Sequence, residues 1–209
     1  MNVVLYGASG MIGSRVLQEL LRRGHAVTAV VRNPDKVVPA DRVRVVKGDV
    51  TDPASVAATA KGAEAAISAY SPPPSAPETV VPAARALLAG LEHAGVRRLI
   101  VVGGAGSLEV APGLQLVDAP NFPEQWKGIA LAHRDVLPVL QASDAEWTYP
   151  SPAALIEPGQ RTGKARLGDL RLVTDARGES RISAEDYAVV LVDELEQPKH
   201  IRQQFTAAY

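Results

Sequence analysis

The stretch Val3-Val4-Leu5-Tyr6-Gly7-Ala8-Ser9-Gly10-Met11-Ile12-Gly13 decides the fold of this chain. An apolar run ends in three glycines and passes directly into a helical pattern, which predicts a strand, a tight turn and a helix. Gly7 allows a sharp turn, Gly10 allows the backbone to approach a bound group, and Gly13 allows the helix to pack closely on the strand. The free N–H groups and positive dipole end of this helix suit a pyrophosphate.

The sequence around the glycines supports a nucleotide-binding unit. Apolar residues continue at helical spacing as far as Leu21, Gly24 ends the helix, and His25–Val31 reads as a second buried strand. Strand, helix and strand together form the βαβ unit that binds dinucleotides. The alternative is an ordinary α/β turn in which the glycines serve only chain reversal. On the first interpretation the cofactor contacts in this turn are Gly7, Ser9, Gly10, Met11, Ile12 and Gly13.

The glycine spacing, Gly-x-x-Gly-x-x-Gly, resembles that of the extended and atypical short-chain dehydrogenase/reductases. Segments from the rest of the chain resemble their NAD(P)H-binding, NmrA-like branch: Glu146–Ala153, Arg161–Lys164, Gly178–Ser183 and Asp186–Ala188. The resemblance covers essentially the whole chain. It implies one doubly wound α/β domain, residues 1–209, with a Rossmann fold and a mostly parallel sheet of six to seven strands in the order 3-2-1-4-5-6-7. The cofactor would cross the carboxyl ends of strands 1 and 4.

The rest of the chain is predicted to form further strands and helices. Beyond the first two strands, the pattern predicts strands at residues 42–47, 63–69, 96–102, 146–153 and 201–206, with a short one at 170–174. Helices are predicted at 78–93 and 124–141 and from Ala184 onward, and residues 109–122 read as a substrate loop.

Composition excludes several classes of protein. The 209 residues carry a formal net charge of -1 with no run of Lys or Arg, which argues against a nucleic-acid partner. The absence of cysteine excludes disulfides and thiolate chemistry, and the four histidines show no metal-binding spacing, so we predict no metal site. No signal peptide or apolar span is recognised, so we expect a cytoplasmic protein with a small-molecule substrate. The sequence leaves monomer and homodimer open.

The residue after the second strand favours NADP(H), with NAD(H) a further possibility. An acidic side chain here binds the ribose 2′-hydroxyl of NAD, whereas an arginine accommodates a 2′-phosphate. This chain has Arg32, followed by Asn33-Pro34. One charge-assisted contact of roughly 1.5–3 kcal/mol would favour NADP by about one to two orders of magnitude. The alternative is a solvated arginine at a strand end.

Further cofactor contacts follow from the resemblance. Asp49-Val50 resembles the adenine site of the branch, whereas Asp52 before Pro53 is assigned as a helix cap. The end of the fourth strand, at Ala69, Tyr70 and Ser71, is expected against the ribose. Nearer the nicotinamide the resemblance implies Gly103 and Gly104 after the fifth strand and Pro152 after the sixth.

The catalytic residues of the superfamily are missing from their expected helix. The superfamily places a Tyr-x-x-x-Lys pair there, but Trp126 stands at the tyrosine position and an apolar residue at the lysine position. The remaining catalytic candidates are Ser107 and Tyr149, and a loop serine bonding its own backbone is an equal alternative for Ser107. Lys127 and His133 are the remaining ionisable groups of this helix, and for both we expect a solvated helix face.

Three functions therefore remain open. The first is an NADPH-dependent oxidoreductase that transfers hydride to a small conjugated acceptor such as a quinone, flavin or enone. The second is a non-catalytic NADP(H)-sensing regulatory protein, as known in the NmrA-like branch. The third is an epimerase or dehydratase-like enzyme, which requires an acid/base pair that the sequence does not reveal.

Overall fold

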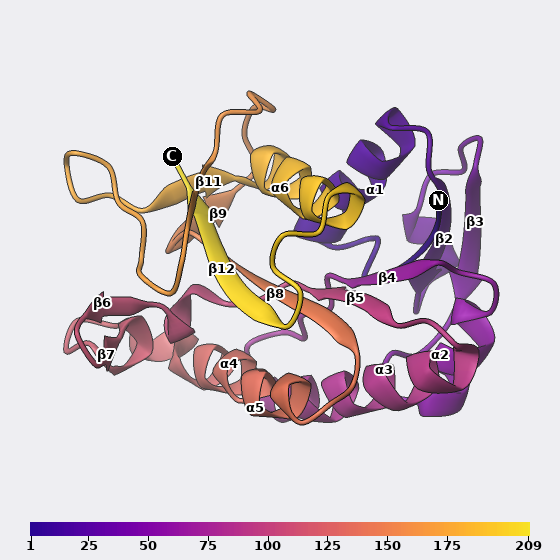
Figure 1. Cartoon of the computed structure of the whole chain (residues 1–209), viewed down its shortest axis with the longest axis horizontal. Helices are drawn as coiled ribbons and strands as arrows, with labels where there is room; N and C mark the ends of the chain where they lie inside the picture. Colours follow the sequence, from indigo (N-terminus) through magenta and orange to yellow (C-terminus); the bar gives the residue numbers. More distant parts are fainter.

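A computed structural model describes the whole chain, Met1–Tyr209, as an eight-stranded sheet with helices on both faces (Figure 1). The strand order is β10-β12-β8-β5-β4-β1-β2-β3, and only β10 runs antiparallel to its neighbour. The strands are β1 (Asn2–Tyr6), β2 (Ala26–Val31), β3 (Val43–Lys47), β4 (Ala65–Ser68), β5 (Arg98–Val101), β8 (Glu146–Pro152), β10 (Arg166–Gly168) and β12 (Gln203–Ala208).

The seven strands predicted outside residues 170–174 pair in the predicted order, and the doubly wound α/β fold is confirmed. Every residue of β4 and β5 is buried, as expected for parallel strands covered on both faces. The predicted strand at 170–174 is wrong, because the extra edge strand lies earlier, at Arg166–Gly168. The Asp169 carboxylate accepts a hydrogen bond from the Arg171 amide at 3.1 Å, which turns the chain immediately after β10.

Helices cover the two faces of the sheet unequally. In Figure 1, α1 and α6 lie on one face and α2 to α5 on the other. Each face has its own apolar core, one of 25 and one of 19 buried residues, so both layers contribute to stability. The helices are α1 (Met11–Arg22), α2 (Pro53–Ala60), α3 (Val80–Ala94), α4 (Glu124–Arg134), α5 (Val136–Gln141) and α6 (Ala184–Glu196).

The helix predicted over 124–141 is two helices, α4 and α5, that meet at Asp135. Pro138 explains the break, because its ring nitrogen cannot donate to the Arg134 carbonyl one turn earlier. α4 has no fully buried residue, whereas Val136 and Leu140 of α5 reach the core. The break lets α4 pack against the loops at the carboxyl edge of the sheet.

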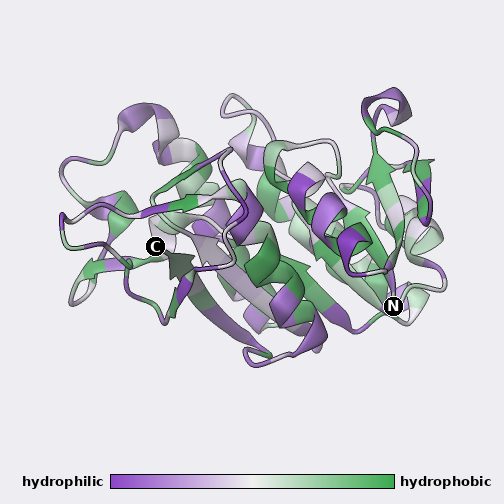
Figure 2. Ribbon diagram, turned by 90° about the horizontal axis from the view of Figure 1, so that it is seen from above, coloured by the Kyte–Doolittle hydropathy of each residue, from purple (hydrophilic) through white to green (hydrophobic).

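Two small two-stranded sheets lie outside the central sheet. The predicted substrate loop at 109–122 contains a small hairpin, β6 (Glu109–Ala111) and β7 (Leu114–Gln115), and β9 (Leu155–Glu157) pairs with β11 (Arg181–Ser183). Figure 2 shows hydrophobic residues gathered on the central strands and hydrophilic residues on the surrounding loops. No helix combines the length and apolar content needed to cross a bilayer.

A cluster of charged side chains joins α1, α6 and the segment after β9. The Glu19 carboxylate, only 3% exposed, accepts from Arg161 at 2.7 and 2.8 Å and from Arg23 at 2.8 Å. Arg23 also donates to Asp193 at 2.7 Å and to Glu196 at 2.8 Å. Hydrogen bonds from Arg161, with a further contribution from Arg23, lower the pKa of Glu19 to about 2 despite its burial.

Glu19→Gln is expected to lower the free energy of unfolding by about 2 kcal/mol at pH 7, because charge-assisted bonds of this kind are lost. The pKa of Glu19 is depressed in the folded state, so its contribution is present above pH 4.5 and disappears as pH falls from 4.5 toward 2. Urea unfolding at pH 7 and pH 3 checks this. Glu92→Gln, at an exposed position on α3, is the control; an equal loss in both variants would contradict the assignment.

Candidate cofactor-binding site

The glycine turn between β1 and α1 has no room for side chains at two positions. Gly7 has φ 78°, and a Cβ there would lie 2.6 Å from the Ala69 carbonyl oxygen. A Cβ on Gly13 would lie 2.0 Å from the Gly7 carbonyl oxygen. At Gly10 the nearest atom to such a Cβ is the same oxygen at 3.3 Å. Gly7 and Gly13 are therefore needed to bring helix, strand and turn together, whereas Gly10 is exposed.

The N-terminus of α1 is open to an anion. Gly10 provides no side-chain cap, the first turn contains no acidic residue, and the first helical bond is Ser14 N–H to the Gly10 carbonyl at 2.9 Å. The amides of Met11, Ile12 and Gly13 are thus left without a partner inside the helix. α6 begins differently, because Ser183 caps it and acidic residues occupy its first turn. Of these two helices only α1 presents free amides and a positive dipole end.

A cavity of about 350 Å³ opens in front of this turn. It lies at the carboxyl ends of β1, β2, β3 and β4, where the order of the doubly wound sheet reverses between β1 and β4. Open α/β sheets bind ligands at this switch point, and the size suits part of a dinucleotide. The cavity is lined by Tyr6, Gly7, Ser9, Gly10, Val30, Val31, Arg32, Gly48, Asp49, Val50, Thr51, Ala69, Tyr70, Ser71 and Thr79.

Arg32 and Asp49 lie at the β2 and β3 side of the cavity. Both are exposed, and Arg32 makes no hydrogen bond or ion pair within the protein. Asp49 Oδ1 accepts from the Thr51 amide at 2.9 Å and from the Thr51 hydroxyl at 2.7 Å, and these bonds lower the pKa of Asp49. Its Oδ2 has no partner in the protein. Asp52 caps α2 through the Ala54 amide at 3.0 Å, which confirms its predicted capping role.

The two hydroxyls considered for catalysis are both engaged in bonds within the fold. Tyr149 is fully buried and donates to the His133 carbonyl at 2.6 Å, and burial raises the pKa of its phenol. Ser107, 5% exposed, donates to the Gly104 carbonyl at 3.3 Å and accepts from Gln204 Nε2 at 2.8 Å. The structure therefore brings neither hydroxyl to the wall of the cavity.

The glycines and proline expected near the nicotinamide follow β5 and end β8. A Cβ on Gly103 would lie 2.5 Å from the Tyr149 ring, so this glycine makes room for the buried tyrosine. Gly104 lies against His133, and Pro152 is buried in pairing with Ala207 of β12. None of the three lines the cavity at the glycine turn. They lie on the β5 and β8 side, beyond Ser71.

Two polar side chains at the cavity, those of Thr51 and Thr79, were not predicted from the sequence. Both line the cavity together with Ser71, and the Tyr70 hydroxyl is 3.0 Å from that of Thr79. His133, expected on a solvated helix face, is instead partly buried, and burial lowers its pKa to about 4. A signal for Thr51 was available, because it directly follows Asp49-Val50.

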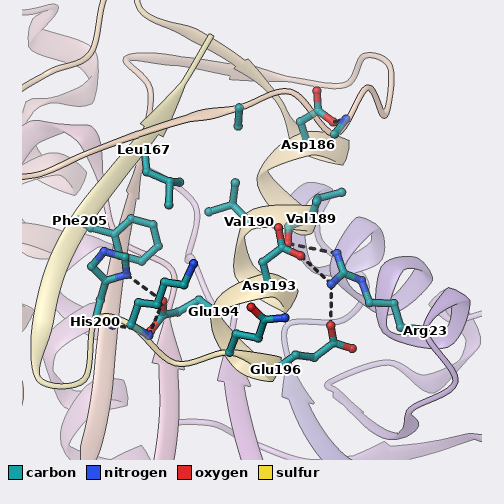
Figure 3. Close-up of a pocket in the computed structure, with 14 residues that line it drawn as sticks. Arg23, Leu167, Asp186, Val189, Val190, Asp193, Glu194, Glu196, His200 and Phe205 are labelled. Atoms are coloured by element: carbon teal, nitrogen blue, oxygen red, sulfur yellow. Dashed lines mark hydrogen bonds and ion pairs between the residues drawn. The ribbon is translucent and has the colours of Figure 1, made fainter.

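A larger cavity, of about 420 Å³, lies along α6 and is a poor candidate for the cofactor (Figure 3). At one end of this cavity Glu194 contacts Arg98, the first residue of β5. This end therefore lies at the amino ends of the strands, whereas the glycine turn lies at their carboxyl ends. Most of its acidic groups are ion-paired, Glu194 with Arg98 and His200, and Asp193 and Glu196 with Arg23. These contacts join elements of the fold, and a wall so rich in carboxylates is unfavourable for a pyrophosphate.

Comparison with known proteins agrees with this geometry. The model of the NAD(P)H-binding family matches residues 7–198, which begins in the glycine turn and includes nearly the whole fold. The chain belongs to the NAD(P)H-binding family. A nicotinamide cofactor is therefore the ligand class of this family member, and the glycine turn with its cavity is its candidate site.

The relatives of this family member extend over its whole length. The uncharacterized protein YwnB of Bacillus subtilis is 40% identical over 210 residues, covering 99% of this chain and 97% of YwnB. A Burkholderia pseudomallei structure, provisionally named an exported protein, is 52% identical with TM-score 0.92 and full coverage of both chains. A Streptococcus pneumoniae structure, provisionally named an NADH-flavin reductase, is 32% identical with TM-score 0.88 and covers 100% and 99% of the two chains.

Proposed function

We propose that this family member is an NADPH-dependent oxidoreductase that reduces a small conjugated acceptor, such as a quinone, flavin or enone. The observation that carries the proposal is the convergence of Gly10, the open α1 N-terminus and unpaired Arg32 on one cavity. The Streptococcus relative, provisionally named an NADH-flavin reductase, supports the acceptor class.

Each part of the site has a role in holding the cofactor. The amides of Met11, Ile12 and Gly13 would bind the pyrophosphate, with Ser9 beside them. Arg32 would bind the 2′-phosphate, while Asp49 and Val50 would bind the adenine. Ala69 and Tyr70 would border the ribose, and Gly103, Gly104 and Pro152 the nicotinamide. Bound NADPH supplies a hydride, and the chain supplies orientation and exclusion of water.

The acceptor class follows from what α4 lacks. Trp126 is 48% exposed at the tyrosine position of the usual dyad, and Ala130, four positions later, stands where the dyad would have its lysine. A positioned acid contributes about 10² to 10⁴-fold to the reduction of a simple carbonyl. A quinone or flavin spreads the incoming charge over a conjugated system, so its reduction depends mainly on close positioning.

NADPH oxidation is therefore expected to be faster with quinones and flavins than with aldehydes and ketones of similar size. Ser107→Ala and Tyr149→Phe are each expected to change the rate by less than about 10²-fold, the lower end of an acid's contribution. Steady-state rates across a matched panel of acceptors check both expectations. Fast aldehyde reduction abolished by either substitution would contradict the proposal and identify a catalytic acid.

The second candidate is an NADP(H)-sensing regulatory protein. The observation that favours it is that Ser107 and Tyr149 are both held in hydrogen bonds within the fold. Tight NADPH binding without turnover on any acceptor would select this alternative. A Bacteroides thetaiotaomicron relative, 42% identical, is provisionally named an epimerase, but no acid/base pair lines the cavity here.

The absence of cysteine fits a reducing compartment, and the proposal places the reaction in the cytoplasm. Cell fractionation tests that part independently.

A further inference from the structure

His133 occupies a position over the carboxyl ends of two central strands. It lies near the end of α4, and a Cβ on Gly104 would be 3.2 Å from the His133 Cβ. Gly104 follows β5 and precedes the short helix Ala105–Ser107. The side chain thus starts directly above the turn that leaves β5.

The imidazole points from this turn toward the cofactor cavity. His133 Nε2 lies 3.5 Å from the Ser71 hydroxyl, and Ser71 lines the cavity together with Gly7 and Gly10. Arg32 and Asp49 mark the opposite, β2 and β3 side of the same cavity. The ring therefore stands on the side left for the nicotinamide and its acceptor.

The backbone beneath the ring is fixed from the core. The buried Tyr149 hydroxyl donates to the His133 carbonyl at 2.6 Å, and the Tyr149 ring packs against Gly103. This contact gives Tyr149 a positioning role through His133. It also explains why Gly103 and Gly104 are both without side chains, since one accommodates the tyrosine and the other the histidine.

No charged side chain pairs with the imidazole. The neighbouring charges on this part of the chain, Arg134, Asp118 and Asp135, form ion pairs with one another, with Arg134 Nη1 3.2 Å from Asp118. Tyr149, the titratable group bonded to the His133 backbone, stays protonated. Burial lowers the pKa of His133 to about 4, so the ring is neutral near pH 7. A neutral imidazole still has one N–H donor.

We propose that His133 is a catalytic residue that donates a hydrogen bond, as a neutral imidazole, to the oxygen or nitrogen of the acceptor where negative charge collects. This inference rests on the proposed function and adds the group that replaces the missing dyad. The hydride and its two electrons come from the reduced cofactor, the final proton comes from water, and His133 gives up neither. A fixed donor of this kind stabilises charge only as it develops.

The test compares two substitutions at His133. His133→Phe keeps a ring but removes the donor, and is expected to lower kcat/KM for a naphthoquinone by about 10²-fold, the usual effect of losing one such donor. NADPH affinity should change less than about threefold, because binding rests on other residues. His133→Gln retains an N–H and should restore most of the rate. His93→Phe, at an exposed position on α3, is the matched control.

Two further readouts separate this role from a structural one. The wild-type rate should be flat from pH 6 to pH 8, whereas an imidazolium acid would lose activity as pH rises. In nuclear magnetic resonance spectra, adding the naphthoquinone to the NADP⁺ complex should shift the His133 imidazole signals and leave those of His93 unchanged.

Each outcome has a clear meaning. Normal quinone reduction by His133→Phe, or unmoved His133 signals, would overturn this inference while leaving the proposed function intact. Failure of the wild-type protein to oxidise NADPH with any acceptor would overturn the proposed function and this role together.

Discussion

Gly10→Val is expected to abolish NADPH binding while leaving the protein folded. A Cβ at this position would lie 3.3 Å from the Gly7 carbonyl oxygen, a tight contact that a small shift of the turn would relieve. The two methyl groups of valine would then project into the space assigned to the pyrophosphate, in front of the α1 amides. We expect at least about a hundredfold loss of affinity, the equivalent of roughly 2.7 kcal/mol, in a calorimetric titration.

Gly13→Ala provides the contrasting control for this experiment. Its Cβ would lie 2.0 Å from the Gly7 carbonyl oxygen, so the helix and the turn cannot both keep their positions. This variant should unfold at a lower temperature than Gly10→Val, although it adds fewer atoms. Near wild-type NADPH affinity in folded Gly10→Val would show that the pyrophosphate binds elsewhere.

Arg32→Ala is expected to remove most of a preference for NADPH over NADH. The guanidinium is exposed at the cavity and has no partner in the protein, so it is available to a 2′-phosphate. NADPH affinity should fall by about 10- to 100-fold, and NADH affinity should stay nearly constant.

Parallel titrations of both cofactors measure the preference. Lys36→Ala removes a neighbouring exposed cation that does not line the cavity, and should leave both affinities unchanged. Equal affinities of the wild-type protein for the two cofactors would contradict this role of Arg32.

Most of the sheet could be predicted from the sequence, because each buried strand has its own local pattern of apolar residues. Buried parallel strands appear as continuous apolar runs, and the glycine spacing indicates the turn between β1 and α1. β10 escaped prediction because an edge strand of three residues has little apolar pattern of its own. The break between α4 and α5 was foreseeable from Pro138, whose missing N–H interrupts the helix.

The candidate site likewise contains residues that could be predicted from the sequence and one that could not. The glycine turn was predicted from its spacing, Arg32 from its place after the second strand and Asp49 from the family resemblance, and Gly7, Gly10, Arg32 and Asp49 line one cavity. His133 could not be placed, since its contact with Ser71 joins residues 62 positions apart. The low pKa of His133 results from its burial, which depends on tertiary contacts that the sequence pattern of α4 does not show.

The most direct test of the account is a single turnover of protein-bound NADPH after mixing with a quinone. The reduced cofactor is followed by absorbance, once with ordinary NADPH and once with NADPH deuterated at the transferred position. We expect oxidation of one NADPH per site, and slower oxidation of the deuterated cofactor because the hydride is transferred in the measured step. Bound NADPH that stays reduced with every quinone, flavin and enone would contradict it.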